Sequence, residues 1–129
     1  MSGEPVRYSP RVRELFAALP RAGSLAAGAG TAVHGESAAL DRGAWVRFEA
    51  RIEGGRIADC AFRAWGCPHT LAAAAWLAGR MQSAPVTATK AAEVRELAHE
   101  IDAPAGKLGK LLAVVDAQEA LLAAARAVQ

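Results

Sequence analysis

Alternating hydrophobic and polar residues predict two strands in the middle of the chain. In residues 46–52 every second residue is hydrophobic and the residues between them are charged, so this strand has one buried and one wet face. Gly54 and Gly55 predict a hairpin turn, and the return strand runs from Arg56 to about Trp65. The residues that the same alternation assigns to its buried face are Ala58, Cys60, Phe62 and Ala64. A shorter strand is predicted at residues 31–37.

Hydrophobic residues recur at helical spacing in four other segments. Ser9 can cap the first helix, with Pro10 at its first position, and Pro68 begins the second. Thr89 can cap the third. The predicted helices cover residues 10–19, 68–81, 90–101 and 107–128. A helix, then antiparallel strands, then three helices predict an α+β fold: a small three-stranded antiparallel sheet with helices packed on one face.

The length of 129 residues suits one domain, so we expect residues 1–129 to form a single unit. The net charge of +2 is small and scattered, which argues against nucleic acid as a partner. No apolar run is long enough to cross a membrane, and the first residues lack the apolar core of a signal peptide. We therefore expect a cytoplasmic protein, without a membrane partner, whose thiols stay reduced.

The segment from Trp65 to His69 carries the most reactive chemistry. If Pro68 is the first helical residue, Cys67 is the N-cap, where free N–H groups and the positive end of the helix dipole favour a thiolate. Gly66 allows the sharp turn from strand to helix. Cys60, by contrast, is predicted to be a small core residue.

Metal ligation is the second chemistry to weigh at this turn. His69 follows Cys67 by two positions, which separates the two side chains on a regular helix, although at a helix start the ring can curl back. Asp41 would add a carboxylate donor for zinc. No CxxC or HxxxH spacing supports this set of Cys67, His69 and Asp41, so it stays a hypothesis.

The sequence resembles the iron–sulfur cluster assembly scaffold family of the IscU/NifU N-terminal type. The strongest match is residues 62–67, Phe-Arg-Ala-Trp-Gly-Cys, which is similar to the family's Phe-x-x-aromatic-Gly-Cys segment. Residues 8–9, 20–24 and 55–59 support it, as does Val115-Asp116-Ala117 in the last helix. The resemblance extends from about Tyr8 to Ala125 and implies the family's fold.

The resemblance also implies a site in which three cysteines and an aspartate hold iron and sulfur. Only Cys67 is present of these three thiols. The positions where this chain has other residues than the family are Arg42, Ala44, Gly109 and Lys110. Pro104 to Lys107 correspond to the segment that partner chaperones read in the family.

The leading hypothesis is a divergent scaffold-like protein, not an enzyme, that acts in iron–sulfur cluster assembly. By resemblance its cofactor is an iron–sulfur cluster or zinc, and its partner is a cysteine desulfurase or a related assembly protein. One alternative is an interaction module that docks such a partner without holding a cluster. The other is a thiol enzyme that uses Cys67 with His69 as its base. The oligomeric state stays open.

Overall fold

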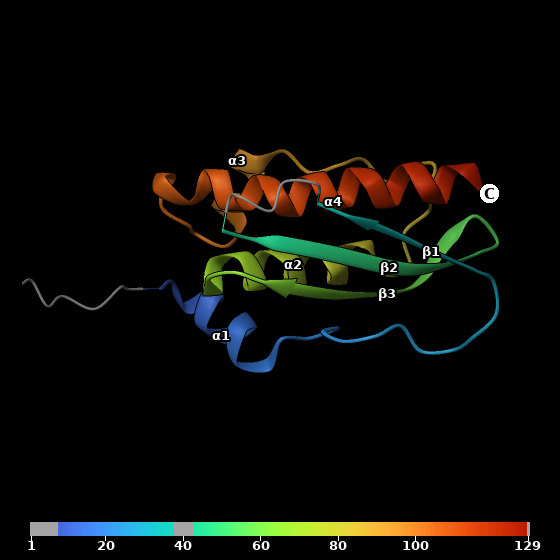
Figure 1. The fold of residues 1–129 in the computed structure, drawn as a ribbon, viewed down its shortest axis with the longest axis horizontal. Helices are drawn as coiled ribbons and strands as arrows, with labels where there is room; N and C mark the ends of the chain where they lie inside the picture. Colours follow the sequence, from blue (N-terminus) through green and yellow to red (C-terminus); the bar gives the residue numbers. More distant parts are fainter. Residues whose placement is uncertain (1–7, 38–42, 129) are drawn as a thin grey trace, which may run out of the picture.

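The computed structural model describes residues 8–37 and 43–128. The elements in chain order are α1 (Pro10–Ala18), β1 (Thr31–Glu36), β2 (Trp45–Glu53), β3 (Arg56–Trp65), α2 (Pro68–Met81), α3 (Val94–Glu100), a 3-10 turn (Ala105–Lys107) and α4 (Leu108–Ala127). Figure 1 shows the strands side by side with the helices beside them. The predicted α+β class is confirmed.

The sheet is antiparallel, with the strand order β1-β2-β3. The short first strand, which the sequence predicted at 31–37, is confirmed as an edge strand paired with β2. Gly54 and Gly55 join β2 to β3 and have φ angles of 61° and 74°. Two consecutive positive φ angles are the geometry of a tight hairpin turn, and they explain why both positions are glycine.

One face of the sheet forms half of the core. The inward residues of β2 are buried, as the alternation predicted, and so are Cys60 and Phe62 of β3. The prediction for Ala58 is wrong, because the register shifts between Arg51 and Ile52. Ile52 therefore pairs with Ile57, and Ile57 is fully buried while Ala58 is half-buried. An extra residue in one strand moves the inward position by one.

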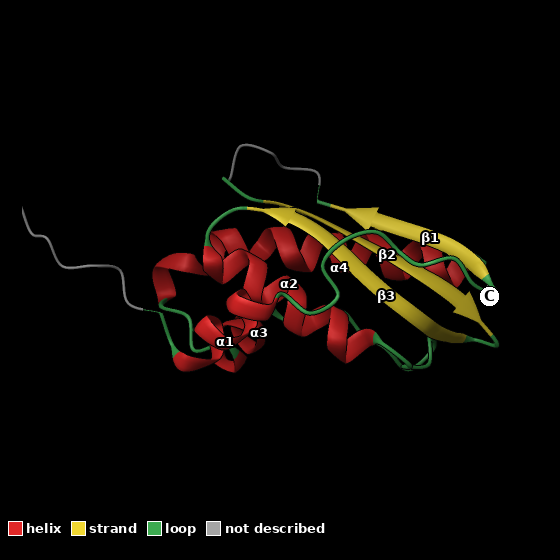
Figure 2. Cartoon of the chain, turned by 90° about the horizontal axis from the view of Figure 1, so that it is seen from below, coloured by secondary structure: helices red, strands yellow, loops and turns green. Residues whose placement is uncertain are grey.

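Two helices, α2 and α4, cover that face of the sheet. Figure 2 shows the helices on one side of the strands, as the sequence predicted. Alanines 72–75 of α2 are all buried, so the helix backbone approaches its neighbours closely. Gly35 of β1 serves the same purpose for α4, since a Cβ there would lie 2.1 Å from the backbone nitrogen of Leu121.

The other two helices form an outer layer, α1 against α2 and α3 against α4. Ser9 caps α1 as predicted: its Oγ accepts from the Val12 N–H at 3.1 Å and donates to the Ile101 carbonyl at 2.6 Å. The predicted cap at Thr89 is wrong. Its hydroxyl donates to the Pro85 carbonyl at 2.6 Å, and α3 begins only at Val94.

The outer face of the sheet carries no helix among the described residues. The segment 23–30 crosses it, held where the Leu25 N–H donates to Glu49 at 3.2 Å and where Arg51 donates to the Ala29 carbonyl at 2.7 Å. Within residues 8–37 and 43–128, no helix is long and apolar enough to cross a membrane.

Candidate functional site

The site is built on the turn between β3 and α2. β3 ends at Trp65 and α2 begins at Pro68, which makes Cys67 the N-cap with extended backbone angles (φ −78°, ψ 168°). Gly66 has φ +148°, and a Cβ there would lie 3.1 Å from the Thr70 side chain. The predicted location of Cys67 at the start of a helix is therefore confirmed, and glycine is needed before it.

The Cys67 thiol is half-buried and surrounded by hydrogen-bond donors. Its Sγ lies 3.8 Å from Thr70 Oγ1 and 4.0 Å from His69 Nδ1. Burial raises the pKa of Cys67, but the N–H and hydroxyl of Thr70, the N–H of His69 and the charge of Lys107 outweigh it, so the pKa lies below its ordinary value. Sγ accepts no well-formed capping bond, so these donors act mainly through their electrostatic field.

His69 forms the inner wall beside the thiol. The side chain curls back, so that Nδ1 faces Cys67, and only 1% of the residue is exposed. Its ring packs against the ring of Tyr8, with centroids 5.0 Å apart. Burial lowers the pKa of His69, and the charges of Lys107 and Lys110 lower it further, so the imidazole is neutral at pH 7. The other ring nitrogen, Nε2, is buried without a hydrogen-bond partner among the described groups.

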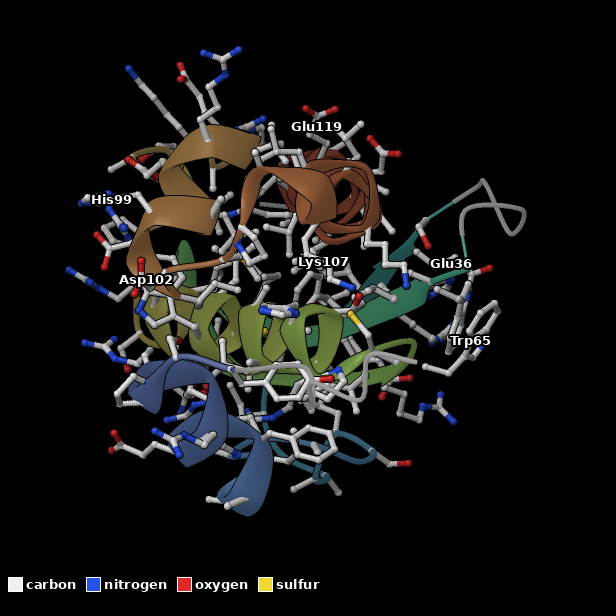
Figure 3. The ribbon with its side chains drawn as sticks, turned by 90° about the vertical axis from the view of Figure 1, so that its left-hand side faces the viewer. Glu36, Trp65, His99, Asp102, Lys107 and Glu119 are labelled. Carbon is white, nitrogen blue, oxygen red and sulfur yellow. The ribbon has the colours of Figure 1, made fainter. Side chains whose placement is uncertain are left out.

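Two lysines complete the site from the start of α4. Lys107 ends the 3-10 turn, and Lys110 lies in the first turn of α4. Figure 3 shows Lys107 between α4 and α2, at the same end of the molecule as Trp65. Lys110 lies close to Gly43, where an added Cβ would be 3.9 Å from Lys110 Cε. Within the part of the chain that the structure describes, neither lysine forms an ion pair.

Of the remaining positions that the sequence singled out, those that the structure describes lie partly in the core and partly on the surface. Ala44, just before β2, is fully buried and belongs to the core, whereas Gly109 at the start of α4 is exposed. Pro104 is exposed just before the 3-10 turn that ends in Lys107. Asp41 and Arg42 lie outside the described residues.

Cys60 takes no part in this chemistry. It is 2% exposed, and burial raises its pKa to about 12, outweighing the lowering by the charge of Arg21, with a smaller rise from Asp59. A thiol with that pKa stays protonated and unreactive at neutral pH. The expectation that Cys60 is a core residue is confirmed, which leaves Cys67 as the reactive thiol.

The described residues around Cys67 do not by themselves supply the ligands of a cluster or a structural zinc ion. Both need about four donors, mainly thiolate, imidazole or carboxylate. Among the described residues, no three such side chains gather in one place. Cys67 and His69 are the two donors that come together, and the neighbours that complete the site are the cations Lys107 and Lys110. The described surroundings of the thiol are therefore cationic.

Two contributors at the site were missed by reasoning from the sequence. Thr70 lies three residues after the N-cap, the position whose N–H and side chain face a capping group, so its spacing was a usable signal. Tyr8 reaches His69 only through the packing of the chain start beside α2, and no local pattern indicates that contact.

Comparisons with known proteins identify the family. The model of the NifU-like N-terminal domain matches residues 7–128, so the chain belongs to this family. The resemblance seen in the sequence is thereby confirmed. No curated protein matches the chain.

Two solved structures share the fold, and a third is similar to the chain. A candidate iron–sulfur cluster assembly scaffold protein for the SUF system from Fervidobacterium islandicum AW-1 superposes with a TM-score of 0.66 at 13% identity, covering 89% of this chain and 96% of that one. A crystal structure described as a hypothetical protein gives 0.53 at 14% identity, covering 84% and 98%. A nitrogen-fixing NifU-like protein (N-terminal) from Brucella abortus gives 0.46 at 22% identity, covering 91% and 83%.

Proposed function

We propose that this protein serves iron–sulfur cluster assembly as a carrier of a single sulfur atom on Cys67, and does not build a cluster on ligands of its own. Membership of the NifU-like N-terminal family supports the link to cluster assembly. The observation that carries the carrier role is the site itself: one activated thiol, next to cations where further ligands would be needed.

The chemistry of loading is a transfer between sulfur atoms. The Cys67 thiolate attacks the outer sulfur of a persulfide on a cysteine desulfurase. A new S–S bond forms on Cys67 while the S–S bond of the donor breaks, and the donor cysteine leaves as a thiolate. The persulfide on Cys67 is itself an anion, so the helix N-terminus and Lys107 stabilise it as they stabilise the thiolate.

We assign the docking surface for the desulfurase to the end of the molecule around Cys67. Trp65 is 49% exposed there, which makes it one of the few large apolar side chains on the described surface. Pro104 is exposed next to Lys107 and belongs to the same proposed surface. Exposed aromatic residues beside charged ones are typical of protein interfaces. A carrier thiol needs a reducing compartment, which agrees with the cytoplasmic location expected from the sequence.

A test of this proposal follows the sulfur. The protein is incubated with a cysteine desulfurase and cysteine, and intact mass then shows whether one sulfur atom has been added. The expected result is addition to the wild type and to Cys60→Ala, and none to Cys67→Ala. An unmodified wild-type protein would refute the carrier role.

A second measurement separates the carrier from a scaffold. The wild type and Cys67→Ala are reconstituted anaerobically with iron and sulfide, and bound iron, acid-labile sulfide and visible absorption are measured. We expect neither protein to hold a stoichiometric chromophore, because the residues that the structure describes supply too few donors around Cys67. A chromophore that requires Cys67 would instead make the protein a scaffold with unfamiliar ligands.

The exposed Trp65 supports a second candidate function, that of a module which docks a partner without accepting sulfur. Desulfurase binding that survives Cys67→Ala but is lost in Trp65→Ala, with no sulfur on the wild type, would favour this alternative. The contact between His69 Nδ1 and Cys67 Sγ supports the third hypothesis, a thiol enzyme with His69 as its base. It lacks an orienting group at Nε2 among the described residues.

A further inference from the structure

Among the residues that the structure describes, the surroundings of Cys67 carry more positive charge than one thiolate balances. Lys107 and Lys110 are two of the three lysines in the chain, and both are half-buried at this point. Their charges reach the site, because Lys107 acts on Cys67 and both act on His69. The nearby carboxylate of Glu36 is already paired with Arg47 at 3.4 Å. A thiolate alone leaves one unit of positive charge without a described partner.

His69 is a second, independent sign of a ligand at the site. The residue is 1% exposed, yet among the described residues Nε2 has no hydrogen-bond partner and Nδ1 has only the long contact of 4.0 Å to Cys67 Sγ. A neutral imidazole carries one N–H. Because no described acceptor faces Nε2, the proton is better placed on Nδ1, where it points at the sulfur. Buried polar groups left this poorly satisfied in a native structure ask for an explanation such as a ligand.

We propose that this site binds a small dianion that carries a sulfane sulfur, of which thiosulfate is the simplest, and that Cys67 takes the sulfur directly from it. This inference rests on the proposed carrier function and adds a second class of donor to it. It also explains the cations beside the thiol, because Lys107 and Lys110 repel iron ions but attract an oxyanion.

The transfer balances without any other reactant. The Cys67 thiolate attacks the sulfane sulfur of thiosulfate and forms a new S–S bond. The S–S bond of thiosulfate breaks, and its electron pair leaves with sulfite. One thiolate and one thiosulfate dianion give one persulfide anion and one sulfite dianion, so the total charge is unchanged. No external oxidant or reductant takes part.

Electrostatics decide whether this step can occur. A thiolate and a dianion repel each other, and in water that repulsion keeps them apart. At this site two lysines and the N-terminus of α2 offset the repulsion and then stabilise the departing sulfite. Lys107 ends the 3-10 turn and Lys110 follows in the first turn of α4, and in this inference the two lysines hold the oxygens while the sulfane sulfur faces Sγ.

The experiment measures sulfite release and the mass of the protein after mixing the full chain with thiosulfate at low, fixed ionic strength. The expected result is sulfite equal in amount to the protein and one added sulfur on Cys67. Cys67→Ser gives neither product. Lys107→Met and Lys110→Met each lower the second-order rate constant by about tenfold or more, because clustered charge of one sign raises the encounter rate of a counter-ion by that order.

Matched controls separate charge from structure. Lys90→Met removes the third lysine, which is exposed in the segment before α3 and leaves the rate unchanged. Lys107→Arg and Lys110→Arg keep the charge and restore most of the rate. Sulfate, which has the charge of thiosulfate but no sulfane sulfur, slows the wild-type reaction as a competitor. If the methionine variants do not fold, the arginine variants and the sulfate competition decide the question.

The outcomes distinguish this inference from the proposed function. Sulfur loading by a desulfurase without loading by thiosulfate overturns the inference and leaves the carrier role standing. Loading by thiosulfate alone supports the inference and removes the link to a desulfurase. A rate that Lys90→Met lowers as much as Lys110→Met, or that sulfate does not affect, means that no defined anion site exists and overturns the inference.

Discussion

Replacing Gly66 with alanine tests whether the turn before Cys67 is built as described. Gly66 has φ +148°, a region that side chains rarely adopt, and a Cβ there would lie 3.1 Å from both Cβ and Oγ1 of Thr70. Backbone strain of this kind costs about 1–3 kcal/mol. Because Thr70 is fully buried, it cannot move aside freely. We expect Gly66→Ala to lower the free energy of unfolding by about 2–3 kcal/mol.

The assay for this change is urea unfolding, followed by circular dichroism, with Gly109→Ala as the matched control. Gly109 lies in the first turn of α4, and an added Cβ meets no atom within 4 Å. Alanine there should be neutral or stabilise the protein by up to about 1 kcal/mol. If Gly66→Ala and Gly109→Ala unfold at the same urea concentration, the described turn geometry is wrong.

The same variant has an expected effect on reactivity. A shift of Thr70 moves its hydroxyl and N–H away from Cys67 Sγ, which they help to hold as a thiolate. Alkylation of Cys67 by iodoacetamide at pH 7 should therefore be slower in Gly66→Ala than in the wild type, while Gly109→Ala leaves it unchanged. An unaltered rate in a destabilised Gly66→Ala would show that Thr70 does not support the thiolate.

Three further predictions concern the thiols and the core. The rate of Cys67 alkylation should rise with pH at a lower midpoint in the folded protein than in urea, because folding lowers its pKa; an equal or higher midpoint contradicts this. For Cys60, folding raises the pKa from 9.0 to about 12, so the unfolded chain loses this proton first. In the wild type, this thiol should then lower the free energy of unfolding by about 1.4 kcal/mol per pH unit between those pH values. In Cys60→Ala this contribution should be absent. Gly35→Ala places a Cβ 2.1 Å from the Leu121 nitrogen and should destabilise the protein by about 1–3 kcal/mol; an unchanged urea midpoint would mean that α4 does not pack directly on β1.

Most of the fold follows from local pattern. Alternation in β2 and helical spacing in α2 and α4 predicted these elements with ends within one or two residues of the structure. The predictions that were wrong have local causes that the pattern of hydrophobic residues does not record. Ala58 was assigned inward because alternation assumes an unbroken register, whereas β3 holds one extra residue. The predicted cap of α3 was wrong because the Thr89 hydroxyl is bonded to the Pro85 carbonyl, and the helix begins only at Val94.

The site was predictable only in part. The Gly-Cys-Pro order fixes Cys67 at a helix start, because each residue type suits its position in such a turn. The electrostatic surroundings could not be predicted the same way. Lys107 lies far from Cys67 in the sequence and reaches it only because α4 packs beside α2. The sequence shows that both lysines lie near the start of the last helix, but only the structure brings their charges to bear on the thiol and its histidine.

The lysines and the thiolate depend on each other. Lys107 and Lys110 are half-buried without ion pairs among the described residues, which is unfavourable for two like charges near a helix N-terminus. A thiolate on Cys67 removes much of that penalty, and an anionic ligand would remove more. Replacing Cys67 with a neutral residue should therefore leave the two lysine charges destabilising. Replacing the lysines with neutral residues should raise the pKa of the Cys67 thiol towards its ordinary value and lower its reactivity. This mutual dependence is what an anion site predicts and a metal site does not, because two cations without ion pairs among the described residues lie beside one thiol.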